Sequence, residues 1–241
     1  MKTKIMGLIL ARNEEDILGE CLEHHIREGV SQFIFTDNAS VDSTRRIAEK
    51  FPEVVKIIDE PRLTYNQDRW ATRMARMACD YSPDWLVVID ADEFWYGLES
   101  LDEVAKDVGT LVVRDFYLHP PTDKIKEPFH TSQMPFFDKE NRQFGDDLTG
   151  RLLFRPSPTI DLAFGQHHVK NVPGRKEATD KINIHHYPNR AYDRFEQKII
   201  NGVRSMIAGG HGEGYAYHWR KLYDHWQKGE LREKYNEMCV K

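Results

Sequence analysis

Cysteine is scarce in this sequence, which has only three among its 241 residues. Cys21, Cys79 and Cys239 are far apart in the chain and odd in number. Such a set provides neither a disulfide framework nor the closely spaced ligands of a structural zinc site. The scarcity predicts a protein of a reducing compartment, and we expect a cytoplasmic location.

A long apolar run and an excess of positive charge are also missing. No segment is apolar over the length that spans a bilayer. The N-terminal letters MKTKIMGLILARNEE hold a short apolar run without a small-residue cleavage site, which favours a strand over a signal peptide. The formal net charge is -5, so no overall basic field predicts a nucleic-acid partner.

The residues that are present predict an α/β fold. Hydrophobic residues make up 40% of the chain, enough to exclude a mostly disordered protein. Strand and helix patterns alternate in the first half, which is typical of right-handed crossovers in a mostly parallel sheet with helices on both faces. The expected strands are residues 4–11, 31–37, 54–59 and 85–90, and the expected helices are residues 14–29, 41–51 and 69–81.

The region from about Tyr192 onward predicts a helical extension. Two helices are expected there, separated by the letters GGHGEG at residues 209–214, and the second covers residues 215–235. Its aromatic stripe is explained most simply by core packing or an oligomer contact. A peripheral membrane face is less supported, because acidic residues lie among the basic ones. The pattern leaves the oligomeric state open.

Polar residues follow three of the expected parallel strands. These strand ends are Ala11-Arg12-Asn13-Glu14, Asp37-Asn38 and Asp90-Ala91-Asp92-Glu93. The carboxyl ends of parallel strands meet at one edge, where α/β proteins bind ligands. A single aspartate after a strand is more often a loop starter or a helix cap. The acids after residue 89, together with two matching strand ends, favour a site for Mg²⁺ or Mn²⁺.

Four stretches of the chain resemble a known family. They are ARNEEDILGECLEHHIREGVSQFIFTDNASVDST, DADEF, GQHHV and IHHYPNRAYDRFEQKIING, in that order. Together they resemble family 2-type glycosyltransferases with the GT-A fold, in the subgroup related to the GT92-type enzymes. The resemblance implies a GT-A catalytic domain over residues 1–190, with a nucleotide-binding half of about 1–95 and an acceptor half of about 96–190. Residues 191–241 would form the helical extension packed on that domain.

The resemblance also implies roles at the strand ends. The stretch from Ala11 to Glu14 would line the nucleotide base and ribose, and Asp37 with Asn38 would hold the base. Asn38 replaces the usual second aspartate, which leaves the base open between a favoured UDP-sugar and a GDP- or dTDP-sugar. Asp90-Ala91-Asp92 resembles the Asp-x-Asp motif, in which the first aspartate faces the ribose or the metal and the last binds the metal. Glu93 would be an additional ligand or a supporting neighbour.

Histidines in the second half add to the expected site. His185 and His186 end a predicted strand, and strand alternation puts them on opposite faces. The resemblance favours His186, next to Tyr187, as a metal ligand from late in the sequence that joins Asp90 and Asp92, with His185 as a packed neighbour. It also selects His167, either as an acceptor contact or as a loop residue. An imidazole ligand favours Mn²⁺ over Mg²⁺.

Phosphate contacts and the catalytic base are less clearly marked. Arg69 and Gln67 stand at a helix start that favours anions, so they are expected near the nucleotide. The base should be a carboxylate between the Asp-x-Asp motif and His186. Asp146 and Asp147, in a loop before a strand, are the preferred candidates, although either one could be a turn residue beside Gly145.

Together with the polar strand ends, the resemblance implies a metal-dependent, inverting glycosyltransferase of the hexosyl- or deoxyhexosyltransferase class. It would move a sugar from a nucleotide-sugar donor to a hydroxyl of a glycan, lipid-linked or protein-linked acceptor, in polysaccharide or glycoconjugate biosynthesis. Two alternatives stay open. One is a metal-dependent nucleotidyltransferase or phosphohydrolase, which the absence of a Gly-rich phosphate loop disfavours. The other is a non-catalytic protein that binds sugar nucleotides.

Overall fold

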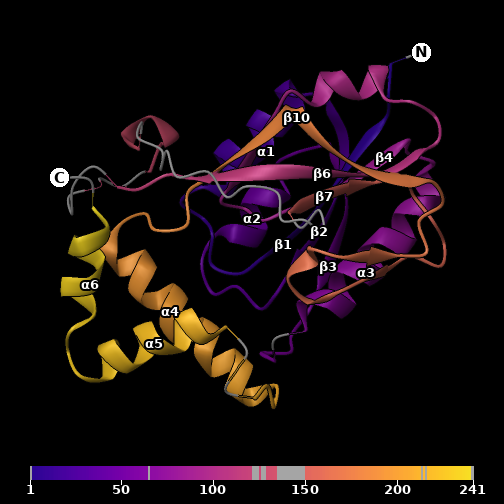
Figure 1. The fold of residues 1–241 in the computed structure, drawn as a ribbon. Helices are drawn as coiled ribbons and strands as arrows, with labels where there is room; N and C mark the ends of the chain where they lie inside the picture. The colour runs from indigo at the N-terminus through magenta and orange to yellow at the C-terminus, as the bar shows by residue number, and fades with distance from the viewer. Residues whose placement is uncertain are drawn as a thin grey trace. The chain divides into compact units, whose positions relative to one another are not determined.

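The computed structural model describes residues 2–64, 66–120, 125, 129–134, 150–212, 214 and 216–239. The chain divides into two compact units. Unit 1 comprises Met1–Pro61, Gln67–Phe116 and Glu140–His186, and unit 2 comprises Arg62–Asn66, Tyr117–Lys139 and Tyr187–Lys241. Unit 1 holds the sheet and unit 2 holds the C-terminal helices (Figure 1).

An eight-stranded sheet organises unit 1, in the order β3-β2-β1-β4-β7-β6-β10-β5. Its first half is parallel, because β1 pairs with β2 and β4, and β2 pairs with β3. Its second half contains the antiparallel pairs β4–β7, β6–β7 and β5–β10. The strands are β1 (Ile5–Ala11), β2 (Val30–Asp37), β3 (Val54–Asp59), β4 (Trp85–Ile89), β5 (Glu93–Tyr96), β6 (Val108–Tyr117), β7 (Arg151–Phe154) and β10 (Arg175–His186).

Helices connect the parallel strands as the periodicity predicts. They are α1 (Leu18–Arg27), α2 (Thr44–Ala48) and α3 (Gln67–Ala78), followed by the 3-10 turns η1 (Cys79–Tyr81), η2 (Leu98–Glu103), η3 (Thr131–Gln133) and η4 (Phe164–Gln166). The turn of α1 into β2 uses Gly29 at a φ of 100°, a conformation that glycine adopts without a Cβ penalty. A separate two-stranded ribbon joins β8 (Asp161–Leu162) and β9 (Val169–Lys170).

The core of unit 1 follows strand alternation. Met6, Leu8 and Ile34 lie on one face of the parallel strands and pack against α3 through Met74 and its neighbours. Phe33 and Phe35 alternate with Ile34 and point to the other face, which α1 and α2 cover. All five residues of β4 are buried, as expected of a central strand that is covered on both sides.

In the described part of unit 2, α-helices from the C-terminal region enclose a hydrophobic core (Figure 1). They are α4 (Tyr192–Ala208), α5 (Tyr217–Gln227) and α6 (Leu231–Met238). Phe195, Ile199, Leu231 and Tyr235 are buried between them. A Cβ at position 202 of α4 would lie 2.1 Å from a ring carbon of Trp219, so only glycine permits this contact with α5.

The expected helix over residues 215–235 was wrong, because the chain divides it into α5 and α6. Gly229 has a φ of 76°, which ends α5 and lets α6 begin at Leu231. The aromatic stripe of Trp219, Tyr223 and Trp226 packs against the core of unit 2, in agreement with the structural explanation. No helix in the described part of the chain has the length and apolar character needed to cross a membrane.

Candidate functional site

The carboxyl ends of β1 and β2 lie side by side. Ala11 is opposite Asp37 in the parallel register, and the Asn38 N–H donates to the Ala11 carbonyl at 2.9 Å. The Asp37 side chain is buried, and its Oδ2 accepts from the Ser40 N–H at 3.2 Å. Its Oδ1 is buried with no hydrogen-bond partner among the described residues. This edge therefore holds a carboxylate oxygen with unused accepting capacity.

The two loops after these strands hold each other. Asn13 adopts a positive φ of 57°, which asparagine tolerates better than most residues. Its N–H donates to Ser40 Oγ at 3.0 Å, and its Oδ1 accepts from the Val41 N–H at 2.9 Å. The Glu14 N–H donates to Thr44 Oγ1 at 2.7 Å. The stretch from Ala11 to Glu14, with half-buried Arg12, thus forms a fixed wall at the sheet edge.

A buried acid extends this wall beyond Asn38. Asn38 Nδ2 donates to the Glu60 carbonyl at 3.0 Å, so the base-binding candidate is held by the residue after β3. The Glu60 carboxylate is buried, and Arg73 of α3 contacts it at 3.3 Å. The sequence patterns did not single out Glu60 or Arg73. This pair ties α3 to the same edge of the sheet.

Asp90 follows β4 and is held on both carboxylate oxygens. Gln67 of α3 donates to Oδ1 at 3.4 Å, and Arg151 of β7 donates to Oδ2 at 2.5 Å. Gln67 therefore lies at the site, as its position at the helix start predicts. Arg69 is exposed in the same first turn of α3, and the structure gives it no contact with Asp90.

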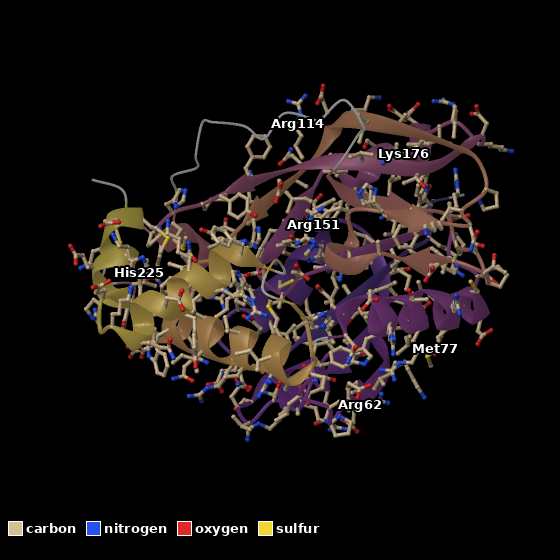
Figure 2. All side chains as sticks on the ribbon, turned by 60° about the horizontal axis from the view of Figure 1, so that its bottom comes forward. Arg62, Met77, Arg114, Arg151, Lys176 and His225 are labelled. Carbon is tan, nitrogen blue, oxygen red and sulfur yellow. The ribbon has the colours of Figure 1, made fainter. Side chains whose placement is uncertain are left out.

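Glu93 is fully buried at the start of β5, beside buried Ala91 and Asp92. Its Oε1 forms an ion pair with the guanidinium of Arg151. Burial raises the pKa of Glu93 to about 7, against the opposing charge of Arg151. Burial alone would lower the pKa of Arg151, but Glu93 and Asp90 raise it above its ordinary value. Arg151 lies among the strands of unit 1 (Figure 2).

Asp92 and His186 come together although they are distant in the sequence. His186 Nε2 lies 3.4 Å from Asp92 Oδ1, and both side chains are nearly buried. His186 Nδ1 lies 3.9 Å from Asp115 Oδ2 and also 3.9 Å from Glu93 Oε1. Burial lowers the pKa of His186, but the charges of Asp92 and Glu93 and hydrogen bonding to Asp92 and Asp115 outweigh it and raise the pKa to about 9.

His185 points away from this cluster. In the antiparallel register His186 is opposite Glu93 and His185 is opposite Phe94, so the two histidines lie on different faces. The ring of His185 packs against Tyr96 at a centroid distance of 4.5 Å, and Tyr96 packs in turn against His24. The structure thus brings His186, and not His185, to Asp92.

The remaining predicted residues divide into two groups. His167 is half-buried, and its Nδ1 hydrogen-bonds the Gly150 carbonyl at 3.1 Å, a contact that serves loop structure. Asp146 and Asp147, the candidate bases, lie outside the described residues.

The donor set fits a divalent cation that is shared with a ligand. Within the described residues, no group of three or more acidic, histidine or cysteine side chains is arranged to hold a metal ion alone. Two ligands that bind one ion at about 2.1 Å lie roughly 3.0–3.4 Å apart, depending on the geometry. Asp92 Oδ1 and His186 Nε2 have this separation. Mg²⁺ is commonly held by one or two carboxylates together with substrate phosphates, so a protein pair is sufficient.

The acidic cluster consists of Asp90, Asp92, Glu93 and Asp115, with Arg151 and His186 beside them. The sequence patterns did not single out Arg151 or Asp115. The pairing of Leu86 with Phe154 and of Val87 with Leu153 runs antiparallel, which brings Arg151 beside the end of β4. A lone arginine before the apolar letters LLF was the available signal. It becomes meaningful only once β7 is known to pair with β4.

Comparisons with known proteins give a family and a fold. The model of Glycosyl transferase family 2 matches residues 8–152. A structure of S. aureus TarS 1-349 in complex with UDP-GlcNAc is 15% identical, with 83% of this chain and 66% of that chain covered and a TM-score of 0.52. Another structure of S. aureus TarS is 13% identical, with 84% and 39% covered and a TM-score of 0.50.

A third similar structure is glucosyl-3-phosphoglycerate synthase from Mycobacterium tuberculosis in complex with Mn²⁺, UDP and glucosyl-3-phosphoglycerate. It is 15% identical, with 88% of this chain and 82% of that chain covered and a TM-score of 0.42. The sequence matches no curated protein. The likeness to TarS supports the expected GT-A fold with C-terminal helices. The chain spans about two thirds of the first TarS structure and 39% of the second.

Proposed function

This chain belongs to glycosyl transferase family 2, and from that premise we propose that it transfers a sugar from a nucleotide-sugar donor to a hydroxyl acceptor in a metal-dependent, inverting displacement. A UDP-sugar is the favoured donor, with a GDP- or dTDP-sugar as the alternative. The acceptor is a glycan or a lipid- or protein-linked glycoconjugate. The transferred group is a hexosyl or deoxyhexosyl residue. We also propose that the chain is related to the GT92-type enzymes. In this proposal residues from 1 to about 95 bind the nucleotide and residues from about 96 to 190 bind the acceptor.

The observation that supports this function most is the contact between Asp92 and His186. The two side chains come from β10 and from the turn after β4, and they meet at 3.4 Å beside the ends of the parallel strands. This is the edge at which an open α/β sheet binds its ligand.

The nucleotide would lie along the wall from Ala11 to Glu14. Asp37 Oδ1 is buried without a partner in the described chain and is therefore suited to accept a hydrogen bond from a base N–H. Asn38 is oriented beside Asp37 by the hydrogen bond that its Nδ2 donates to the Glu60 carbonyl. Asp90 and Ala91 would face the ribose and the diphosphate. Arg69 is exposed at the start of α3, with its side chain available to a phosphate.

Asp92 and His186 would hold the divalent ion, with Mn²⁺ favoured over Mg²⁺ because one ligand is an imidazole. A cation in this place supplies stabilisation of the negative charge that develops on the leaving diphosphate. A carboxylate on the opposite side would take the proton of the acceptor hydroxyl. We assign that role to Asp146 or Asp147. A single base and a single displacement produce inversion without a covalent intermediate.

Donor hydrolysis tests this function. The full chain is incubated with UDP-, GDP- and dTDP-sugars, with Mn²⁺ or with a chelator, and released nucleotide is identified by chromatography. We expect slow, metal-dependent release of a nucleoside diphosphate from one donor. Asp92→Ala should lower the rate by more than about tenfold. Asp107→Ala is the matched control, since Asp107 is a surface carboxylate paired with Arg175 and should leave the rate unchanged.

Other products would point to other functions. Release of a nucleoside monophosphate would indicate a phosphohydrolase or nucleotidyltransferase. Metal-dependent donor binding without any release, even with an array of glycan acceptors, would indicate a non-catalytic binding protein. Equal release from the wild-type protein and Asp92→Ala would contradict the assignment of the site.

A further inference from the structure

Arg151 is a buried cation at the centre of the acidic cluster. It begins β7, and its side chain is 11% exposed. Its Nη2 contacts Asp90 Oδ2 at 2.5 Å and also contacts Glu93 Oε1. One guanidinium thus joins a carboxylate that follows β4 to a carboxylate that begins β5. Figure 2 shows its position among the strands of unit 1.

This pairing divides the acids into two sets. Asp90 has both oxygens engaged, Oδ1 by Gln67 and Oδ2 by Arg151. Glu93 is buried and paired with the same guanidinium. Asp92 faces His186 of β10, with its Oδ1 3.4 Å from the Nε2 of the imidazole. A divalent ion that recruited Asp90 would first have to displace Arg151 from a partly buried, charge-assisted contact, which is costly. Glu93 is fully buried, and an ion that recruited it would compete with the charge of the same guanidinium.

We propose that Arg151 is a positioning residue that reserves Asp90 and Glu93 and thereby confines the divalent ion to Asp92 and His186. The inference rests on the proposed function for the presence of the ion, but it concerns which side chains bind it. Arg151 acts through the carboxylates that it holds. A merely structural arginine would stabilise the fold without deciding which aspartate is a metal ligand.

Mn²⁺ binding tests the role without any need for turnover. The dissociation constant is measured by electron paramagnetic resonance of free Mn²⁺, with UDP present and absent, on the full chain. The variants are Asp90→Asn, Asp92→Asn, Arg151→Met and the double variant Arg151→Met with Asp90→Asn. The asparagine replacements keep side-chain size while they remove charge. The wild type, Asp90→Asn, Arg151→Met and the double variant form a double-mutant cycle between Arg151 and Asp90, and Asp92→Asn serves as the reference for loss of a metal ligand.

We expect Asp92→Asn to weaken Mn²⁺ binding by more than about tenfold. Asp90→Asn in the wild-type background should weaken it by less than about threefold, because only a nearby charge is lost. In the Arg151→Met background Asp90 is released, and the same Asp90→Asn change should then cost about tenfold or more. The dependence of one substitution on the other is a result that a purely structural role would not produce.

Folding is checked by circular dichroism, because Arg151→Met leaves two carboxylates without their cation. Arg151→Lys is the conservative variant. In its background, Asp92→Asn should still weaken Mn²⁺ binding more than Asp90→Asn does. Arg175→Met is the matched control. It removes an exposed arginine from Asp107 and Glu177 and should leave Mn²⁺ binding unchanged.

Equal weakening by Asp90→Asn and Asp92→Asn in the wild-type background would overturn the proposal, and this comparison holds even if Arg151→Met does not fold. An Asp90→Asn effect that is the same with and without Arg151 would overturn it as well. A wild-type protein that binds no Mn²⁺ would contradict both this role and the metal dependence. If the aspartate variants change Mn²⁺ affinity as expected but the protein transfers no sugar, the role of Arg151 is supported and only the proposed function is contradicted.

Discussion

At the scale of the residue, Asp37 has a buried carboxylate oxygen without a hydrogen-bond partner among the residues that the structure describes, which lowers the stability of the native state. A buried polar atom without a partner destabilises the native state by about 1–3 kcal/mol. Asp37 Oδ1 is in this condition within the described chain, while Oδ2 accepts from Ser40. Such an atom in a native structure calls for an explanation, such as a functional role or a bound water or ion. Asp37 lies at the end of β2, at the edge where open α/β sheets bind their ligands.

His25 shows how a buried histidine can limit stability in acid. Its Nδ1 contacts the Cys21 carbonyl at 2.7 Å and must donate, so its Nε2 accepts from the Trp95 N–H at 3.3 Å. Only the neutral ring can do both. Burial, assisted by the neighbouring His24, lowers the pKa of His25 to about 3. Since the unfolded chain binds a proton more readily, the stabilising effect is complete above the unfolded pKa and is lost as the pH falls from about 6.5 toward 3.

The predicted result is a loss of about 2–3 kcal/mol from this one group between pH 7 and pH 4.5. The free energy of unfolding is measured with urea at several pH values for the wild type and for His25→Gln. Glutamine can donate and accept hydrogen bonds but does not titrate in this range. The free energy of unfolding of His25→Gln should therefore depend on pH less steeply than that of the wild type, by nearly one proton. Parallel pH profiles for the two proteins would show that His25 is not the group responsible.

At the scale of the element, the contact between α4 and α5 depends on a missing side chain. Gly202 lies against Trp219, and a Cβ there would be 2.1 Å from the ring. Gly202→Ala should therefore displace Trp219 and destabilise unit 2 by about 1–3 kcal/mol. Thermal unfolding followed by tryptophan fluorescence measures the loss.

The same chain offers a control for that substitution. Gly212 lies in the segment before α5, and a Cβ at this position would meet nothing within 4 Å. Gly212→Ala should change the melting temperature little, since its surroundings are open. Helix propensity and chain entropy both favour alanine inside α4, so a stability unchanged or raised by Gly202→Ala would show that the Trp219 contact does not set the cost at position 202.

The elements also show which parts of the fold the sequence could predict. The strands from β1 to β4 and their helices were anticipated because each strand–helix–strand unit is local in the chain. The sequence pattern does not predict that β7 lies between β4 and β6 in the sheet. Arg151 therefore could not be placed at the site. Alternation in β10 separates His186 from His185, but the choice between them came from the resemblance of His186 and Tyr187 to the family.

At the scale of the whole molecule, ligand binding should appear as added stability. A nucleotide that binds only the native state stabilises it by about 2.7 kcal/mol at a hundred times its dissociation constant. For a chain of this size that corresponds to a rise of several degrees in melting temperature, at about 2–4 °C per kcal/mol. UDP with Mn²⁺ should produce this rise, and a chelator or Asp92→Ala should remove most of it. A shift that survives the chelator would show that the nucleotide binds independently of the metal.

The mixed order of the sheet has a consequence for the growing polypeptide. Asp90, Asp92 and Glu93 are made early, whereas Arg151 follows 61 residues after Asp90 and His186 comes later still. Until β7 is synthesised, β4 presents an open edge and the acids beside it have no internal cation. Long-range strand additions of this kind are slow, and unpaired edges favour association between chains. The repulsion among the uncovered acids then opposes that association, so the charges that later form the site also protect the nascent sheet until its last strands arrive.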